Sequence, residues 1–275
     1  MICAWKELLG ILPLWLRDQV DRQGREDLCE LRLRIDAPPE LITGRGSILL
    51  EQTVKEEDIK FCINTATRYS PWAASGVSKG YITAQGGHRI GLCGEVAVKD
   101  NEVVSFRNVA SVNIRVARDY PGIADRVTGI QDNLLIIGAP GWGKTTLLRD
   151  LARRIAQDST VAVVDERGEL YPPGVARGKC MDVLTGCSKV TGMDMVLRSM
   201  GPEWIVIDEI TAALDAEALI QAVGCGVKLL ATAHASSVQD MKSRKIYQLL
   251  LANNLFSTIV VLRRDKSYYT ERICQ

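Results

Sequence analysis

The chain has 275 residues, and its Lys and Arg (34) nearly balance its Asp and Glu (33), so the formal net charge is +1. This balance argues against a strongly basic protein that coats nucleic acid and against an acidic tail. An aromatic share of 5% weakens the case for a surface that stacks single-stranded bases. A hydrophobic share of 47% is typical of a globular chain with one large or two small domains.

The eight cysteines form no C-x-x-C pair, so the sequence does not favour a zinc ribbon or a thioredoxin motif. Cysteines scattered through apolar runs are usually small buried hydrophobes in a reducing compartment, and we expect that here. No secretory signal is evident, and no apolar stretch reaches the roughly 18 residues that a membrane-spanning helix requires. We therefore expect a cytoplasmic protein that reaches a membrane only through a partner.

The first half of the chain, residues 1–120, is predicted to form a small α+β domain. Residues 31–35 alternate between apolar and polar side chains, which indicates a half-buried strand. Thr53 and Glu56 resemble a capping box, and apolar residues at helical spacing then predict a helix as far as Ala66. Alternating apolar residues predict further strands at 90–98 and 112–116, with a turn at 99–102.

Turn chemistry at residues 119–122 marks the predicted boundary between the two domains. In residues 121–275, short apolar runs alternate with helical patterns, which argues for a parallel sheet covered by helices on both faces. The predicted strands lie at 134–137, 161–164, 205–207, 229–231 and 259–262. The predicted helices lie at 144–155, 211–223 and 238–251. The fold class that we expect for this half is therefore α/β.

A phosphate-binding loop is predicted between the first strand and the first helix of this second half. Residues 138–145 fit G-x-x-x-x-G-K-[ST] at every fixed position, although a glycine-rich turn with an incidental lysine remains the alternative. The glycines let backbone N–H groups point at phosphates, and the following helix adds its positive end. Lys144 is expected to reach the β- and γ-phosphates of ATP, and the Thr145 hydroxyl to bind Mg²⁺. The predicted nucleotide-binding residues are Gly138, Pro140, Gly141, Trp142, Gly143, Lys144, Thr145 and Thr146.

Trp142 is unusual inside such a loop. Its indole either packs across the mouth of the loop or contacts the nucleotide or a neighbouring subunit. We favour packing, because buried aromatic side chains mostly belong to a core.

Polar side chains follow three of the predicted strands, where the carboxyl ends of parallel strands line a ligand crevice. Asp208 is predicted to complete the Mg²⁺ shell and Glu209 to polarise the attacking water, unless the pair is a solvated acidic turn. Glu166 is either a second carboxylate that orients water or belongs to the metal shell, or part of a solvated turn paired with Arg167. His234 is either a sensor of the γ-phosphate or a structural residue.

The order of these motifs resembles the secretion-ATPase superfamily, which includes motors of type II and type IV secretion and of pilus retraction. It consists of the phosphate loop, an Asp-Glu-Arg turn at 165–167, Arg-Ser-Met-Gly-Pro-Glu at 198–203 before the Asp-Glu strand, and Thr-Ala-His at 232–234. Lys-Gly-Tyr-Ile-Thr at 79–83, Gly-Gly-His-Arg-Ile-Gly at 86–91 and Asn-Ile-Arg-Val-Ala-Arg at 113–118 extend the likeness. Within the superfamily, the chain is most similar to the sporulation stage III AA family of predicted channel motors in endospore-forming bacteria.

The resemblance implies a RecA-like P-loop ATPase domain at 121–275, preceded by a smaller α+β domain at 1–120. It further implies a ring, expected to be a hexamer, with nucleotide between the two domains. Asp165 and Glu166 match the acidic box of such motors and His234 matches their histidine box. Arg89 and Arg115 match arginines that can reach the γ-phosphate. Arg115 also lies on the polar face of an alternating strand. A solvated strand arginine with no contact to phosphate is therefore the alternative for this residue.

The expected function is therefore Mg²⁺-dependent ATP hydrolysis that drives a secretion or channel complex through membrane-embedded partner subunits, with no direct nucleic-acid partner. One departure is Ile210-Thr211, where the family pattern would have Ile-Gly after the Asp-Glu pair. An alternative is a nucleotide-gated assembly scaffold with negligible turnover. A DNA-translocating ATPase shares the same core, but the neutral charge and few aromatic residues count against it.

Overall fold

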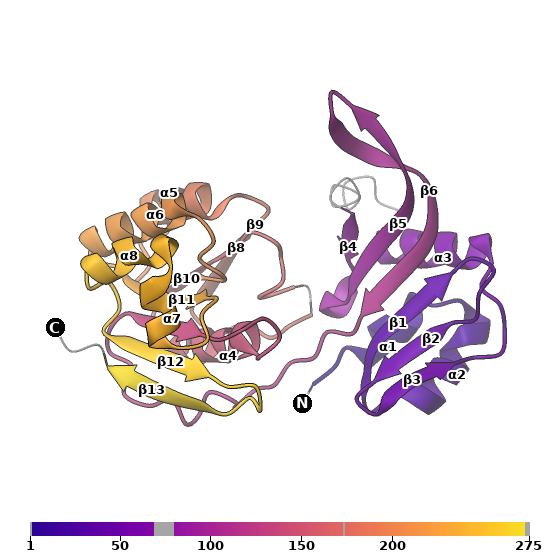
Figure 1. The fold of residues 1–275 in the computed structure, drawn as a ribbon, viewed down its shortest axis with the longest axis horizontal. Helices are drawn as coiled ribbons and strands as arrows, with labels where there is room; N and C mark the ends of the chain where they lie inside the picture. Colours follow the sequence, from indigo (N-terminus) through magenta and orange to yellow (C-terminus); the bar gives the residue numbers. More distant parts are fainter. Residues whose placement is uncertain (1, 69–79, 173, 273–275) are drawn as a thin grey trace. The chain divides into compact units, whose positions relative to one another are not determined.

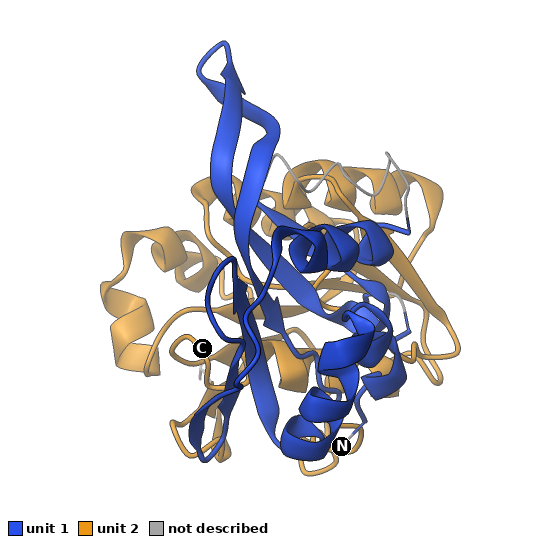
Figure 2. Cartoon of the chain, turned by 90° about the vertical axis from the view of Figure 1, so that its right-hand side faces the viewer, with its two compact units in different colours: residues 1–119, 172–175 blue, residues 120–171, 176–275 orange. Residues whose placement is uncertain are grey.

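The computed structural model describes residues 2–68, 80–172 and 174–272. Lys79 of the motif at 79–83 and Cys274 lie outside the described residues. The chain divides into two compact units, which Figure 2 shows in different colours. Unit 1 consists of Met1–Asp119 and Pro172–Val175, and unit 2 of Tyr120–Tyr171 and Ala176–Gln275.

Unit 1 is built on a six-stranded antiparallel sheet in the order β3-β2-β1-β6-β5-β4 (Figure 1). Its strands are β1 (Leu28–Arg34), β2 (Glu40–Thr43), β3 (Gly46–Leu49), β4 (Tyr81–Thr83), β5 (Arg89–Lys99) and β6 (Glu102–Arg115). Its helices are α1 (Trp5–Gly10), α2 (Leu14–Gly24) and α3 (Glu56–Ala66), and a 3-10 turn spans Gln85–Gly87. The helices and the sheet share one apolar core, in which Leu16, Leu31, Ile59 and Ile114 are buried. Removing such side chains from water stabilises the unit.

The start of α3 differs from the prediction. The helix begins at Glu56, and Lys55 rather than Thr53 precedes its first turn. The carboxylate of Asp58 accepts the backbone N–H of Lys55 at 2.9 Å, so an acidic side chain inside the first turn satisfies a donor there. The predicted Thr53 capping box is therefore wrong, although the helix itself is present.

Strands β5 and β6 are longer than the apolar alternation predicted. Strand β4 pairs with β5 only as far as Gly91, and β1 pairs with β6 only from Ser111 onward. Within the described residues, the remainder of the two strands forms a two-stranded ribbon, which projects beyond the sheet in Figure 1. Asp100 and Asn101 at its tip have φ of +52° and +67°, as the two central residues of a type I′ hairpin turn require.

Unit 2 contains a seven-stranded sheet in the order β13-β12-β7-β11-β10-β8-β9. The strands are β7 (Leu134–Ile137), β8 (Val161–Asp165), β9 (Met181–Thr185), β10 (Trp204–Ile207), β11 (Lys228–Ala233), β12 (Thr258–Leu262) and β13 (Tyr268–Arg272). All neighbouring strands are parallel except β12 and β13. The prediction of a mainly parallel sheet is therefore confirmed, and β9 and β13 are additions at its two edges.

Helices cover both faces of this sheet, as Figure 1 shows. They are α4 (Lys144–Ile155), α5 (Lys189–Ser199), α6 (Ala213–Gly224), α7 (Val238–Ser243) and α8 (Lys245–Ala252). Side chains of alternate strand positions, such as Ile205 and Ile207, share a core with α5, α6 and α8. Because successive side chains of a strand point to opposite faces, Val206 points to the other face, which α4 covers. Among the described helices, none combines the length and the apolar character needed to cross a bilayer.

Two helix predictions need correction. The segment predicted as one helix at 238–251 is two helices, because Arg244 between them has φ −93° and ψ 120°, outside the helical region. The helix predicted to start at 211 starts at Ala213, and the carboxylate of Asp215 accepts the N–H groups of Thr211 and Ala212. Helix α5 has no counterpart among the predicted elements.

The cysteine prediction is wrong at several positions. Cys62 is buried, and burial raises the pKa of its thiol to about 12. Cys29, Cys93 and Cys225 are exposed, and the seven cysteines in the described part of the chain are all free thiols. Exposed cysteines contribute little to a core, so the pattern of apolar neighbours in the sequence did not determine their burial.

Candidate functional site

The predicted phosphate loop connects β7 to α4 in unit 2. Gly141 and Gly143 have φ of +77° and +100°, a region that side-chain-bearing residues rarely adopt, so these two glycines allow the loop to curl. Gly143 directly precedes Lys144, the first residue of α4. The free N–H groups and the positive end of the helix therefore face the concave side of the loop, where an anion is favoured.

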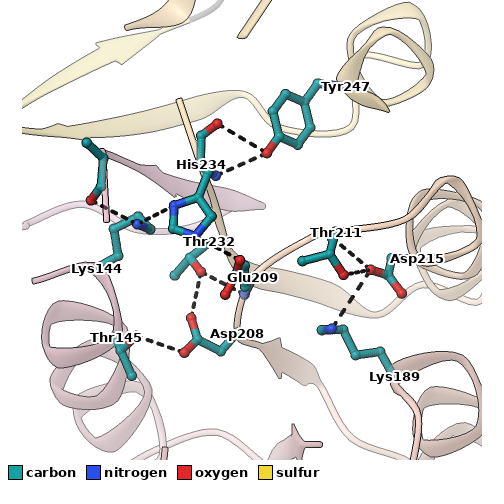
Figure 3. Close-up of polar contacts among 11 residues, drawn as sticks. Lys144, Thr145, Lys189, Asp208, Glu209, Thr211, Asp215, Thr232, His234 and Tyr247 are labelled. Atoms are coloured by element: carbon teal, nitrogen blue, oxygen red, sulfur yellow. Dashed lines mark hydrogen bonds and ion pairs between the residues drawn. The ribbon is translucent and has the colours of Figure 1, made fainter. Parts of the chain in front are cut away.

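Lys144 folds back over this loop. Its Nζ donates to the carbonyl oxygen of Ala139 at 3.1 Å and contacts Nδ1 of His234 at 2.9 Å (Figure 3). Burial lowers the pKa of the Lys144 ammonium, whereas the carboxylates of Asp208 and Glu209 act in the opposite direction. A phosphate on the loop would give this partly desolvated cation a stronger counter-charge than a carbonyl and an imidazole do.

His234 connects Lys144 to Glu209. Its Nε2 lies 2.8 Å from Oε1 of Glu209, while its Nδ1 faces the Lys144 ammonium. Because an ammonium only donates hydrogen bonds, Nδ1 must accept, and the proton of a neutral ring is then on Nε2 and donated to Glu209. The backbone of His234 is held in turn, because its N–H donates to the hydroxyl of Tyr247 at 3.0 Å.

Asp208 lies at the end of β10 and accepts two hydroxyl hydrogen bonds (Figure 3). Thr145 Oγ1 donates to its Oδ2 at 2.8 Å, and Thr232 Oγ1 of β11 donates to its Oδ1 at 2.6 Å. The Thr232 hydroxyl also accepts the backbone N–H of Glu209 at 2.8 Å. Parallel pairing of β10 with β11 brings these groups to one edge of the sheet, although they are far apart in sequence.

Glu209 occupies a backbone conformation that is rare for its residue type. Its φ is +57°, and a left-handed conformation of a residue with a side chain costs roughly 1–2 kcal/mol. The hydrogen bond from its N–H to Thr232 holds it there. Such strain persists where the surroundings fix the residue, and it clusters at functional sites.

Asp165 and Glu166 at the end of β8 differ in their surroundings. Asp165 is buried, and its oxygens accept the backbone N–H groups of Glu169, Leu170 and Tyr171. Burial raises the pKa of the Asp165 carboxyl, and these three donors oppose that effect. Asp165 therefore shapes the turn that follows β8, whereas Glu166 reaches the Nζ of Lys189 at 2.9 Å.

A cavity of about 80 Å³ opens at the carboxyl ends of β8 and β10. It is lined by Thr145, Val164, Asp165, Glu166, Arg167, Glu169, Lys189, Asp208, Glu209 and Thr211. Thr145, Asp208, Glu209 and Glu166, four of the residues predicted for catalysis and metal binding, thus lie around one space. Thr145 and Asp208 offer the hydroxyl and carboxylate oxygens that Mg²⁺ uses when phosphates supply its other ligands.

Trp142 lines a second cavity, of about 120 Å³. It is lined by Tyr120, Ile123, Trp142, Gly143, Thr146, Leu147, Leu262, Lys266 and Tyr268. The Tyr268 hydroxyl is buried without a hydrogen-bond partner among the described residues. An aromatic-lined space with one unsatisfied polar group suits a flat heterocycle better than it suits core packing.

Arg89 and Arg115 both lie in unit 1. They are register partners on the neighbouring strands β5 and β6. The Arg89 guanidinium lies over the ring of Tyr81 at 4.1 Å, and the Nε of Arg115 lies 3.6 Å from Oε1 of Glu30. Their predicted contact with a γ-phosphate stays a prediction.

Sequence reasoning missed several lining residues, among them Lys189 and Tyr268. Lys189 begins a helix with weak apolar periodicity, and Tyr268 lies on an edge strand after a short turn. Neither stands in a recognisable motif. A lysine directly after the capping Ser188 was the one local signal, because Asp and Glu rather than Lys are favoured at that end of a helix.

Comparison with known families finds similarity to sporulation proteins. The family model described as Sporulation stage III, protein AA matches residues 6–272. Stage III sporulation protein AA of Bacillus subtilis (strain 168) is 35% identical over 280 residues, which cover 94% of this chain and 91% of that protein. Protein SEEDLING PLASTID DEVELOPMENT 1 of Arabidopsis thaliana is 27% identical over 256 residues, which cover 88% of this chain and 35% of the plant protein.

Solved structures of an ATPase and of a pilus retraction motor have a similar fold. The Legionella pneumophila ATPase DotB aligns with a TM-score of 0.61 at 14% identity, over 95% of this chain and 80% of that one. The pilus retraction motor PilT with bound ADP aligns with a TM-score of 0.62 at 14% identity, over 96% of this chain and 78% of that one. The expected fold class, a RecA-like P-loop domain preceded by a smaller α+β domain, is confirmed.

Proposed function

The chain belongs to the Sporulation stage III, protein AA family, and from that premise we propose that it is a Mg²⁺-dependent ATPase, the motor of a membrane channel or secretion complex in endospore formation. The observation that carries the proposal is the contact network at the phosphate loop. Contacts of 2.8–2.9 Å join Lys144 to His234 and His234 to Glu209, and Thr145 donates to Asp208 at 2.8 Å. The Thr232 hydroxyl links the two groups, because it donates to Asp208 and accepts the backbone N–H of Glu209. Lys144, Thr145, Asp208 and Glu209 match the parts that P-loop ATPases use for binding, metal coordination and hydrolysis.

The triphosphate of ATP would bind on the loop. Backbone N–H groups of the loop and of the start of α4 would donate to the β-phosphate, and Lys144 would exchange the carbonyl of Ala139 for phosphate oxygens. Thr145 and Asp208 would hold Mg²⁺, which neutralises charge on the β- and γ-phosphates when it is bound. The 2.8 Å contact between their oxygens supports this pairing.

Glu209 is the proposed general base. One of its carboxylate oxygens would accept a proton from the attacking water. The left-handed backbone of Glu209 sets the direction in which its side chain leaves the chain. His234 orients the carboxylate through its Nε2 proton. The same imidazole contacts Lys144. If Lys144 moves when it binds the γ-phosphate, His234 would therefore pass that movement on to the Glu209 carboxylate. Glu166, at the same cavity, is the second candidate for orienting water.

The base of the nucleotide would enter the cavity lined by Tyr120, Trp142 and Tyr268. Aromatic faces stack on a purine, and the buried Tyr268 hydroxyl would gain the hydrogen-bond partner that it otherwise lacks among the described residues. This reading reverses our preference for Trp142 as a packing residue alone.

We further propose that the protein works as a ring, expected to be a hexamer, at the cytoplasmic face of a membrane through embedded partner subunits. Arg89 or Arg115 would complete the site of a neighbouring subunit, and an arginine supplied in this way raises turnover by about 10³-fold or more. Specific activity should therefore rise with protein concentration.

The test is the Mg²⁺-ATPase rate as a function of protein concentration, with particle size measured by light scattering on the same samples. We expect the rate per protein to rise as the particle grows, Glu209→Gln to lose about 10²-fold or more while it still assembles on ATP, and Lys144→Ala to lose binding. Turnover of the wild type no higher than that of Lys144→Ala would contradict an ATPase. Assembly on ATP without turnover would favour a nucleotide-gated scaffold.

A further inference from the structure

Lys189 is a buried lysine with two carboxylate neighbours. It is the first residue of α5, and its side chain is 9% exposed. Its Nζ lies 2.9 Å from Oε2 of Glu166 and 3.9 Å from Oδ2 of Asp215. An ammonium in such surroundings is stable only because it is paired, so its position depends on these two acids.

The two acids are held to different degrees. Asp215 is 9% exposed, and its Oδ2 also accepts the backbone N–H of Thr211 at 2.9 Å (Figure 3). The same oxygen accepts the backbone N–H of Ala212 at 3.0 Å. Glu166 is 41% exposed, and Lys189 is the side chain that holds its carboxylate. Asp215 therefore anchors Lys189, and Lys189 in turn fixes Glu166.

Glu166 and Lys189 line the same cavity as Thr145, Asp208 and Glu209. Its described lining carries the carboxyl groups of Asp165, Glu166, Glu169, Asp208 and Glu209 against the cations of Arg167 and Lys189. A triphosphate bound at Thr145 would add negative charge beside them. Without Lys189, repulsion would push the half-exposed Glu166 outward to solvent, away from the cavity.

We propose that Lys189 is a positioning residue for ATP hydrolysis, which holds the Glu166 carboxylate in the cavity against the charge of the bound triphosphate. The proposal rests on the proposed ATPase function and deepens it, because it gives Glu166 a defined place beside Thr145 and Asp208. In this role Lys189 would not contact the phosphates. It acts through Glu166, and it links the turn after β8 to the turn after β10 through Asp215.

The test compares steady-state ATP hydrolysis by Lys189→Met, Lys189→Arg, Glu166→Gln and the Lys189→Met/Glu166→Gln double variant. We expect Lys189→Met to lower kcat by about 10- to 100-fold with the KM for ATP within about twofold, because a misplaced group lowers the rate more than the binding. Lys189→Arg should keep most of the rate. The double variant should be no slower than Glu166→Gln alone, because residues that act through one another are not additive.

A matched control is Arg153→Met, which breaks another buried ion pair of unit 2. Arg153 and Asp150 are 3.0 Å apart, with side chains 12% and 8% exposed, and neither lines the cavity. Thermal unfolding of this variant should shift downward while kcat per folded protein stays at the wild-type value. A purely structural Lys189 would behave in the same way.

Three results would overturn the inference: wild-type kcat in Lys189→Met, a loss of stability that accounts for its whole rate loss, or a further rate loss when Lys189→Met is added to Glu166→Gln. In each case the wild type still hydrolyses ATP, so the proposed function survives. Absence of turnover in the wild type, relative to Lys144→Ala, would overturn the proposed function and this inference together.

Discussion

Both histidines of the chain use their two ring nitrogens to join segments that are distant in sequence. His234 joins Lys144 to Glu209 in unit 2. His88, in unit 1, is fully buried; its Nδ1 accepts the N–H of Ala117 at 3.2 Å, so its Nε2–H donates to the carbonyl of Ala4 at 2.9 Å. A doubly protonated ring would have to give up the bond to Ala117.

His88 should make unit 1 less stable in mild acid. Burial lowers the pKa of His88 below 6.5, and the Ala4 carbonyl and Glu7 oppose that shift while Arg118 adds to it. Between the lowered pKa and 6.5, the unfolded state binds more protons than the folded state. The stability that neutral His88 contributes is therefore fully present above pH 6.5. It is lost as the pH falls from 6.5 to the lowered pKa, so the free energy of unfolding decreases over that interval. Urea unfolding of wild type and His88→Gln between about pH 7.5 and about pH 5.5 measures this difference.

The variant should be less stable at neutral pH but should have a shallower dependence on pH over that interval, because Gln does not titrate. Carboxylates titrate in both proteins and cancel in the comparison. Equal slopes for the two proteins would contradict a buried neutral His88.

At the scale of elements, α5 shows how packing outweighs local preference. Gly192 lies inside this helix, and helix propensity alone would favour alanine there by about 1 kcal/mol. The structure leaves no room for it. A Cβ at Gly192 would lie 2.4 Å from Cγ1 of Val164 on β8 and 3.1 Å from Sγ of Cys187. Close approach of α5 to the sheet therefore requires glycine.

We expect Gly192→Ala to destabilise unit 2 by about 1–3 kcal/mol, because overpacking forces the helix and the strand apart. Gly224→Ala is the matched control. Gly224 ends α6, and a Cβ there would meet no atom within 4 Å. Thermal unfolding of the two variants should shift in opposite directions or leave the control unchanged. A Gly192→Ala protein as stable as the wild type would show that α5 can move away from β8 freely.

For the whole molecule, nucleotide binding should be visible as stability. A ligand that binds only the folded state adds about 2.7 kcal/mol when its concentration is 100 times its Kd. We expect Mg²⁺-ATP to raise the melting temperature and to slow hydrogen exchange in unit 2, where all residues of the proposed site except the two arginines lie.

Lys144→Ala should lose this stabilisation while it melts close to the wild type without nucleotide. The Lys144 ammonium contacts the carbonyl oxygen of Ala139 and the imidazole of His234, and it does not pack in the apolar core. Its removal should therefore leave the core intact. Equal stabilisation of both proteins by Mg²⁺-ATP would mean that nucleotide binds elsewhere.

The sequence by itself determined the parts that are contiguous along the chain. The phosphate loop, the strands on either side of it and the acidic strand ends follow from short-range patterns, because backbone curl, apolar runs and turn chemistry are local properties. The parallel sheet also followed, from the alternation of strands with helices.

Only the tertiary structure decided which side chains meet. Thr232 became a partner of Asp208 through the pairing of β10 with β11, and Lys189 a partner of Glu166 through the packing of α5 on β8. The break at Arg244, the ribbon of β5 and β6 and the exposure of three cysteines were likewise not predicted. Contacts between residues far apart in sequence depend on strand order and on helix packing, which no local pattern encodes.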